Sequence, residues 1–154
     1  MIGDRRLIPR RPSIHPYESE KQKMKKAYFG IKFHSDHRNK GKIELISSIM
    51  ENLGYKTICI TRDVEKWGQV DLPPNELMLE TFKIIESSDI VVIDLSEKGV
   101  GLGIEAGYAY SRQVPIVTIA EKQQISKTLL GISHDHFVYD GESGLTDFLR
   151  NALT

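Results

Sequence analysis

DIVVIDL (89–95) and GVGLGIEAGYAY (99–110) follow one another in the middle of the chain, and together they decide the fold. The first segment is an almost unbroken apolar run, which is typical of a parallel β-strand covered by helices on both faces. The second crowds four glycines around a single acid, Glu105. A glycine-rich turn between a strand and a helix usually holds a phosphate, but a carboxylate at its centre would repel a phosphate. The turn therefore indicates a different chemistry, centred on Glu105.

Strand-like and helix-like segments alternate on either side of this pair. Strands are expected at 27–33, 55–60, 89–95, 114–120 and 136–140, and helices at 40–54, 75–88, the segment around Glu105 and 143–153. Asn75 is expected to cap the helix at 75–88. The alternation predicts an α/β fold, a flavodoxin-like three-layer sandwich whose five-stranded parallel sheet has the order 2-1-3-4-5. Ligands bind such sheets at the carboxyl ends of the strands, near the switch in strand order. The loops after 27–33 and 89–95 should therefore build the site.

Length and composition describe an ordinary globular chain. The 154 residues suit one domain, and 40% of them are hydrophobic and 27% charged. The net charge is zero, so no overall field favours nucleic acid or an anionic membrane. No apolar run approaches the roughly 20 residues of a membrane span, and no secretion signal is seen, so a cytoplasmic protein is expected. The single cysteine, Cys59, lies in an apolar segment and is expected to be a buried, inert thiol.

Residues 1–26 differ from residues 27–154, which are expected to form the folded domain. The first segment is rich in arginine, lysine and proline, has three acids and lacks apolar periodicity. A flexible tail is the simplest interpretation of this composition. An arm that contacts nucleic acid and a segment that packs on a partner subunit are the alternatives.

A dinucleotide fingerprint is one interpretation of the glycine-rich turn. Gly101, Gly103 and Ala106 satisfy G-x-G-x-x-A, and Glu121 lies about 20 residues on. The turn follows the third expected strand, however, whereas the fingerprint normally follows the first. Glu105 would also place its charge near the pyrophosphate.

A nucleophilic carboxylate is the second interpretation. Gly99, Gly101 and Gly103 would let a small ligand approach the backbone closely. Glu105, near a helix N-terminus, would be held ionised by the helix dipole. Such a carboxylate suits attack on the anomeric carbon of a sugar, as in retaining glycosidases. On spacing alone, the simpler interpretation is favoured, in which Glu105 only helps to start the helix.

The segment VGLGIEAGYA (100–109) resembles the VGLGxELGYA segment of the nucleoside 2-deoxyribosyltransferase family and differs from it at Ala106. YFGIKFHSDHRNKGK (28–42) is similar to the family's first-strand region, and SDIVVIDL and QVPIVTI fall where its third and fourth strands lie. The resemblance covers roughly residues 27–150. It implies a flavodoxin-like sheet, Glu105 as the nucleophile, Tyr28 in the sugar pocket and a site completed by a neighbouring subunit.

The same superfamily includes the deoxynucleoside 5′-monophosphate N-glycosidases, whose first loop grips the phosphate. The similar loop in this chain begins after Gly30, and the resemblance implies that its polar residues contact a substrate: Lys32, His34, Ser35 and Arg38. Gly30 itself is expected to contact the substrate as well. Ser126 matches a later serine that, in the hydrolases, reaches into the neighbour's site.

Two acids of the superfamily pattern are absent. Gly99 stands six residues before Glu105, where the transferases have an aspartate, and Thr81 stands where both groups have an aspartate in the preceding helix. Asp94, at the end of an expected strand, can substitute as a second catalytic acid, or it can simply cap a helix.

The sequence therefore predicts an enzyme that cleaves the N-glycosidic bond of a nucleoside or its 5′-monophosphate through Glu105, by transfer or hydrolysis. No metal or cofactor is expected, because the histidine pairs at 34–37 and 134–136 lack further ligands. A homodimer or larger homo-oligomer is expected, without membrane or nucleic-acid partners. Trp67 either stacks on a base or covers the edge of the core. The alternative function is a non-catalytic domain that binds or senses a nucleotide.

Overall fold

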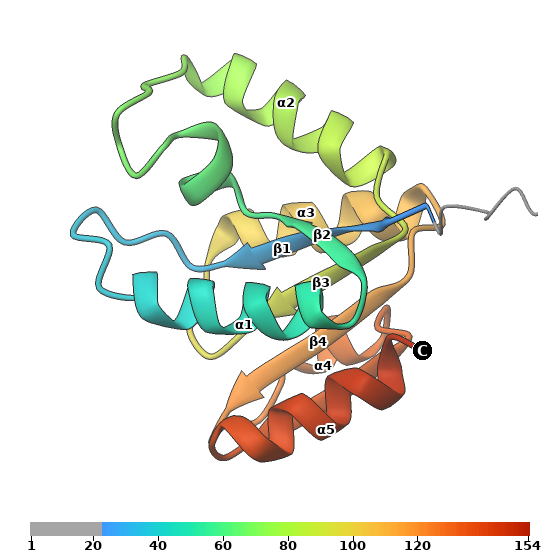
Figure 1. Ribbon diagram of the computed structural model, residues 1–154. Helices are drawn as coiled ribbons and strands as arrows, with labels where there is room; N and C mark the ends of the chain where they lie inside the picture. The colour runs from blue at the N-terminus through green and yellow to red at the C-terminus, as the bar shows by residue number, and fades with distance from the viewer. Residues whose placement is uncertain (1–22) are drawn as a thin grey trace, which may run out of the picture.

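A parallel sheet forms the centre of the computed structural model, which describes residues 23–154 (Figure 1). Its strands are β1 (Lys25–Ile31), β2 (Tyr55–Ile58), β3 (Ile90–Asp94), β4 (Ile116–Glu121) and β5 (Asp135–Tyr139). They pair in the order β2-β1-β3-β4-β5, and all the pairs are parallel. The predicted flavodoxin-like sheet is confirmed. Residues 1–22, most of the expected N-terminal tail, lie outside the described residues.

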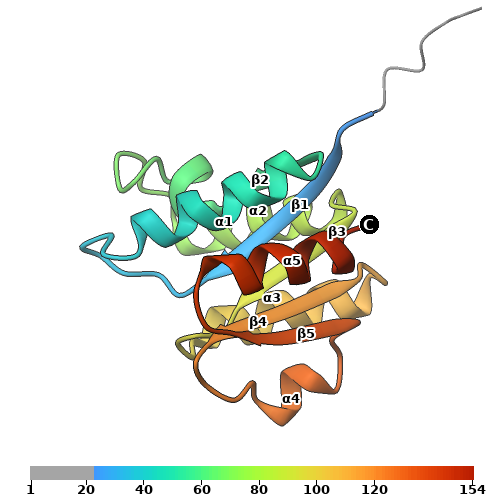
Figure 2. The ribbon, with the colours of Figure 1, turned by 60° about the horizontal axis from the view of Figure 1, so that its bottom comes forward.

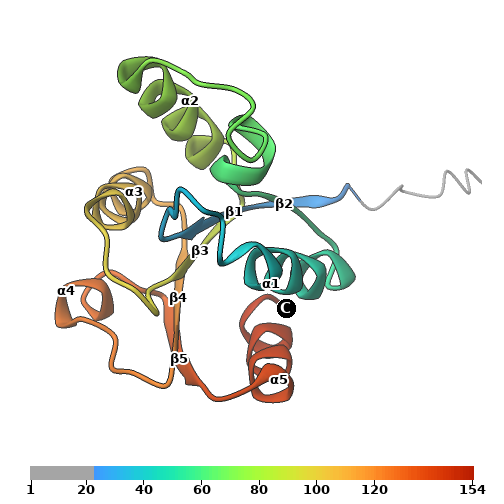
Figure 3. The ribbon, with the colours of Figure 1, turned by 90° about the vertical axis from the view of Figure 1, so that its left-hand side faces the viewer.

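Helices cover both faces of this sheet. They are α1 (Lys40–Asn52), α2 (Pro74–Glu86), α3 (Val100–Ser111), the short α4 (Lys127–Leu130) and α5 (Glu142–Ala152). Figure 3 shows α1 and α5 on one face, with α2, α3 and α4 on the other. Figure 2 shows the edge strand β5 with α5 on one side and α4 on the other. The result is the predicted three-layer sandwich.

Alternation along the strands divides the core into two layers. Successive side chains of a strand point to opposite faces, so Phe29 and Val92 pack in the layer of α1 and α5. Tyr28 and Ile93, one residue away in each strand, pack in the layer of α2 and α3. This alternation decides which strand residues can reach a site on each face.

Most predicted elements differ from the observed ones by one or two residues at an end, and two of these differences have a clear cause. β1 covers Lys25–Ile31 instead of 27–33, because Lys25 already pairs with Tyr55 and the chain leaves the sheet after Ile31. α2 begins at Pro74, so Asn75 is not its cap. Proline suits the first turn of a helix, where its missing N–H would have no partner.

The connection between β2 and α2 contains local structure that the sequence analysis did not predict. A π-helical turn, η1 (Ile60–Val64), follows β2 directly. Such turns are rare and are often found at functional sites. The turn lies at the carboxyl end of the sheet, beside the switch in strand order between β1 and β3, where ligands of this fold class bind.

Candidate active site

Glu105 is the sixth residue of α3, and its carboxylate lies between two glycines. Helical side chains lean towards the N-terminus, so Glu105 reaches over Gly101, one turn earlier. A Cβ atom added to Gly101 would lie 4.0 Å from Glu105 Oε1. A Cβ atom added to Gly30 in β1 would lie 2.7 Å from Glu105 Oε2 and 2.8 Å from Ile93 Cδ1. Gly30 therefore makes room for the carboxylate.

The carboxylate faces a cavity of about 340 Å³ at the carboxyl end of the sheet. β1, the segment after β2, α2 and α3 all contribute to its walls. The apolar lining comes mainly from Phe29, Ile31, Phe33, Cys59, Ile60, Leu77 and Met78, and the polar lining from Tyr28, Thr61, Glu65, Thr81 and Glu105. The volume falls in the range of small-molecule sites, which are also mostly apolar with a few placed polar groups.

Burial sets the charge state of Glu105. It raises the pKa of the carboxyl group from 4.5 to about 7, and the neighbouring Tyr28 hydroxyl opposes part of this rise. Within residues 23–154, the buried Oε2 atom has no hydrogen-bond partner. The expectation that the helix dipole holds Glu105 ionised was wrong, because Glu105 lies in the second turn and the dipole acts mainly within the first. Near neutral pH the site therefore holds both the carboxylate and the carboxylic acid.

Tyr28 lies on the same face of the sheet as Glu105. Its side chain is buried, and burial, followed by the charge of Glu105, raises the pKa of the phenol well above its usual value. The hydroxyl thus stays protonated and can donate a hydrogen bond to the carboxylate or to a ligand. Tyr28 and Gly30 both line the cavity.

Asp94 does not line this cavity. It follows Ile93 in β3, so strand alternation turns it to the other face of the sheet. Its Oδ2 accepts a hydrogen bond from the Tyr139 hydroxyl at 2.8 Å, and its Oδ1 accepts one from the Ser96 N–H at 2.8 Å. Asp94 is fully buried. The prediction that it substitutes for the missing acid is therefore wrong, and the side chain stabilises the end of β3.

Four polar residues of the loop after β1 also lie away from the Glu105 cavity, among the residues that the structure describes. Ser35 is exposed, and the exposed Arg38 donates to Asp36 Oδ1 at 3.1 Å. His34 Nε2 lies 3.0 Å from Glu97 Oε2. Lys32 donates to the Lys98 carbonyl at 2.9 Å. The side chain of Lys32 also packs against Gly99. Lys32 and His34 therefore both lie against the loop preceding α3.

Three further predicted residues have local roles. Gly99 is the N-cap residue of α3 with an extended backbone. Gly103 is exposed, and a Cβ atom added to it would meet nothing within 4 Å in the described part of the chain. Contrary to the expectation, Gly103 therefore does not face the cavity. The Ser126 hydroxyl caps α4 by accepting from the Leu129 N–H.

Two open alternatives are decided by contacts. Trp67 packs against the core beside α1, touches His37 edge to face, and lies under the ammonium group of Lys40. It therefore covers the core edge and is not among the cavity residues that the structure describes. Thr81 lines the cavity, but its hydroxyl donates to the Leu77 carbonyl at 2.8 Å, so it does not replace the missing acid.

Sequence reasoning missed several cavity residues. Phe33, Leu77 and Met78 are apolar and look like ordinary packing residues, although Phe33 is 56% exposed. Glu65 lies in a polar connection that was assigned no function. The one available signal was position: Phe33 and Glu65 follow β1 and β2, whose carboxyl ends lie at the site.

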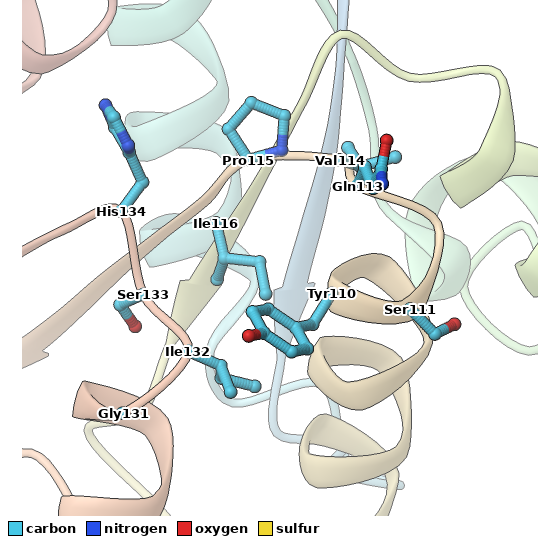
Figure 4. A pocket seen from close by; sticks show the side chains of 10 residues that line it. All are labelled: Tyr110, Ser111, Gln113, Val114, Pro115, Ile116, Gly131, Ile132, Ser133 and His134. Carbon is cyan, nitrogen blue, oxygen red and sulfur yellow. The ribbon is translucent and has the colours of Figure 1, made fainter.

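A larger cavity lies elsewhere. It has a volume of about 720 Å³ and is lined by the end of α3, the start of β4 and the segment that follows α4. Figure 4 shows Tyr110, Ile116 and Ile132 toward its middle. His134 is the one titratable side chain other than tyrosine that lines it within the described residues. The larger cavity therefore lacks a carboxylate among its described lining residues, whereas the cavity at Glu105 combines a carboxylate, a buried phenol and apolar walls.

Residues 23–154 contain neither grouped metal ligands nor a helix that could span a membrane. In this range no three or more His, Cys, Asp and Glu side chains are grouped to hold a metal ion. No helix in the same range has the length and apolar character needed to cross a membrane. Cys59 is buried, as predicted, and burial raises the pKa of its thiol to about 11.

The chain is similar to several named enzymes. No family model matches the chain. A curated protein of Thermofilum pendens carries the provisional name 2′-deoxynucleoside 5′-phosphate N-hydrolase 1. It is 23% identical over an alignment of 122 residues, which covers 73% of this chain and 81% of the relative.

Two solved structures share the fold. The CMP N-glycosidase of Clostridium botulinum has a TM-score of 0.61 and 17% identity, over 83% of this chain and 99% of that chain. The 2-deoxyribosyltransferase of Bacillus psychrosaccharolyticus has a TM-score of 0.64 and 13% identity, over 82% and 90%. At these identities the structures establish the fold. Together with the curated relative, they confirm the resemblance carried by VGLGIEAGYA, and all three are named as enzymes.

Glu105→Gln should stabilise the fold at pH 8 and leave it almost unchanged at pH 4. The raised pKa means that the folded protein favours the neutral carboxyl. This contribution is fully present below the unfolded pKa and is lost as the pH rises through about 7. One pKa unit corresponds to about 1.4 kcal/mol. The free energy of unfolding of the variant should therefore exceed that of the wild type by on the order of 3 kcal/mol at pH 8.

Urea denaturation at pH 4, 6 and 8 measures this difference. Glu76→Gln is the matched control, because Glu76 is an exposed acid on α2 and its removal should change stability little. A difference between Glu105→Gln and the wild type that does not vary with pH would contradict the assignment of a raised pKa.

Proposed function

We propose that this protein is an enzyme that cleaves the N-glycosidic bond of a nucleoside or its 5′-monophosphate, with Glu105 as the nucleophile. One observation carries the proposal: a desolvated carboxylate, whose Oε2 has no hydrogen-bond partner within the described residues, faces an apolar cavity at the switch in strand order. A desolvated anion is a strong nucleophile towards a centre that develops positive charge. The names of the relatives support cleavage of the same N-glycosidic bond. They are a nucleotide N-hydrolase, an N-glycosidase and a deoxyribosyltransferase.

The chemistry has two steps. The ionised Glu105 attacks C1′ of the sugar while the C1′–N bond breaks, and the base leaves with the electron pair and takes up a proton. The product is a covalent ester between Glu105 and C1′. Water, or the nitrogen of a second base, then attacks C1′ and loses its proton, which releases the carboxylate. Tyr28 donates a hydrogen bond that positions the carboxylate or the sugar.

The alternative is a non-catalytic domain that binds a nucleotide. It is favoured by the two positions at which superfamily acids are missing. The Thr81 hydroxyl is engaged by the Leu77 carbonyl, and Gly99 has no side chain that can position a sugar. Such a domain would bind nucleosides without releasing base, so a turnover assay separates it from the enzyme.

Glu105→Ala should abolish base release. Loss of the nucleophile is expected to lower kcat/KM by at least about three orders of magnitude, since it removes the covalent route. In the wild type, kcat/KM should rise about tenfold per pH unit below pH 7 and level off above it, because the carboxylate is the active form. Chromatographic detection of free base from a panel of nucleosides and 5′-monophosphates, with and without an acceptor base, measures both effects.

Glu76→Ala serves as the control, because Glu76 is an exposed acid on α2. This variant should retain activity. Base release by Glu105→Ala at the wild-type rate would refute the mechanism. Tight binding of nucleosides by a wild-type protein that releases no base would favour the non-catalytic alternative.

A homodimer through the outward face of α3 completes the proposal. Glu105 is the one charged residue of this helix, and Val100, Ile104 and Tyr110 are 84%, 47% and 60% exposed. A helix that is apolar all round is normally buried. This face adjoins the cavity, since Gly101 at the start of α3 lines it. A second copy on α3 would close the cavity against water, with Ser126 as the residue expected to reach across.

Ile104→Lys should therefore reduce a dimeric wild type to monomers and slow base release, because it places a charge in the proposed interface. Light scattering at micromolar concentration gives the mass. Val138→Lys on the edge strand β5, where Val138 is 44% exposed, is the control and should leave the mass unchanged. A fully active wild-type monomer would contradict the proposal.

A 5′-monophosphate is the proposed form of the substrate, with Lys32 as its cationic contact. Lys32 packs against Gly99 at the start of α3, whereas Arg38 is held by Asp36 in solvent. The Lys98 carbonyl occupies one of the donors of the Lys32 ammonium, and an ammonium has three.

Lys32→Ala should lower the preference for the monophosphate over the free nucleoside by about tenfold or more, because one charge-assisted hydrogen bond is worth about 1.5–3 kcal/mol. Arg38→Ala should change the preference little. The ratio of kcat/KM for the two substrates measures the effect. If the free nucleoside is the better substrate of the wild type, the phosphate contact does not exist and the transferase reaction is favoured.

A further inference from the structure

The cavity that contains Glu105 holds a second acid, Glu65. Glu65 lies in the segment that follows η1, and it lines the same 340 Å³ as Glu105. The pKa of Tyr28 is raised by the charge of Glu105 and, to a smaller extent, by that of Glu65. Both carboxylates therefore act on the one phenol, and the nucleophilic role proposed above uses only Glu105.

The backbone around Glu65 is fixed by hydrogen bonds at both its polar groups. Its N–H donates to the Ile60 carbonyl at 2.9 Å, and its own carbonyl accepts from the N–H groups of Gly68 and Val70, at 3.0 and 2.9 Å. The turn thus fixes the backbone from which the Glu65 side chain projects.

The turn after Glu65 is strained. Lys66, Trp67 and Gly68 have φ angles of 49°, 57° and 86°. The left-handed region is unfavourable for residues with a Cβ atom, and such strain tends to be retained at functional sites. Trp67 holds the turn in place, because its N–H donates to the Thr61 carbonyl at 2.8 Å and its ring packs on the core. The fold accepts two strained residues directly after an acid that faces the cavity.

The other lining residues leave the polar edge of a nucleoside's base without a hydrogen-bond partner. Phe33, Leu77 and Met78 are apolar and suit the faces of a base. Tyr28 and Glu105 lie together and act at the sugar, while the Thr81 hydroxyl is engaged by its own helix. The polar edge of the base still needs hydrogen bonds, since a buried polar group without a partner is costly. Among the lining residues that the structure describes, Glu65 is the remaining charged group.

We propose that Glu65 selects the base: its carboxylate accepts hydrogen bonds from the edge of the leaving base and favours bases that carry an amino group over their oxo counterparts. This inference rests on the proposed function, because it assumes that a nucleoside occupies the cavity. A carboxylate can only accept, and it pairs with the exocyclic amino group of cytosine in the same way when proteins read DNA. In the oxo counterparts a ring N–H can still donate to one carboxylate oxygen, but a keto oxygen stands where the amino group would donate and is repelled by the carboxylate.

Equilibrium binding tests this selection without turnover. Deoxycytidine is compared with deoxyuridine, and deoxyadenosine with deoxyinosine, by calorimetry on Glu105→Gln, which keeps the size of the nucleophile but removes its reactivity. The amino-bearing member of each pair should bind at least about tenfold more tightly, as expected for a charge-assisted hydrogen bond. Adding Glu65→Gln should reduce both preferences to within about threefold. Adding Glu76→Gln instead, the exposed control acid on α2, should leave them intact.

Thermal melting of each variant confirms that it is folded before binding is measured. Preferences that persist in the Glu65→Gln background, or a wild-type preference for the oxo members, overturn the inference. If the wild type releases free base but discriminates neither pair, Glu65 does not select the base and the proposed function stands. If the protein neither binds nor cleaves any of the four nucleosides or their 5′-monophosphates, the proposed function fails and the inference fails with it.

Discussion

The parallel pairing of β1 with β3 is the constraint on which the rest of the structure depends. In its register Gly30 stands opposite Ile93, and Ile31 opposite Asp94. This pairing creates the switch in strand order, so the loops that leave β1 and β3 meet at one edge. It also places the one position of β1 that lacks a side chain against α3, where the Glu105 carboxylate needs the space. A shift of one residue would turn Phe29 or Ile31 toward that carboxylate.

The same arrangement sets the electrostatics of the site. The layer that contains Glu105 is built from aliphatic residues such as Ile93, Leu102 and Ala106, and it offers the carboxylate little solvation beyond the Tyr28 hydroxyl. The ionised form of Glu105 therefore lowers the free energy of unfolding, because the fold disfavours the anion. Sites that lower the stability of the fold in this way are common where reactivity is needed, and the apolar core on both faces of the sheet offsets the loss.

The fold could be predicted from the sequence because its signals are local. The apolar run at 89–95 and the helical spacing at 40–54 each specify one element, and the order of elements limits the topology. Glu105 could be singled out as a candidate because it is surrounded by glycines. Its raised pKa was not found, since burial comes from strands distant in sequence. Asp94 was misplaced because its position at a strand end was considered without the alternation that turns it away from Ile93. The segment around Glu65 gave no sign that Glu65 faces the cavity, since a strained turn of this kind has no simple sequence pattern.

The contact between Gly30 and the carboxylate has a consequence for how this cavity can change over evolutionary time. One end of the chamber is made of backbone and packed helix, where a side chain at position 30 would displace the Glu105 carboxylate or Ile93. The other end is made of side chains such as Leu77 and Met78, which are partly exposed on α2. Substitutions should therefore be tolerated better at the second end than at the first. A lineage with this architecture can thus diversify in what it accepts while inheriting its reactive centre intact.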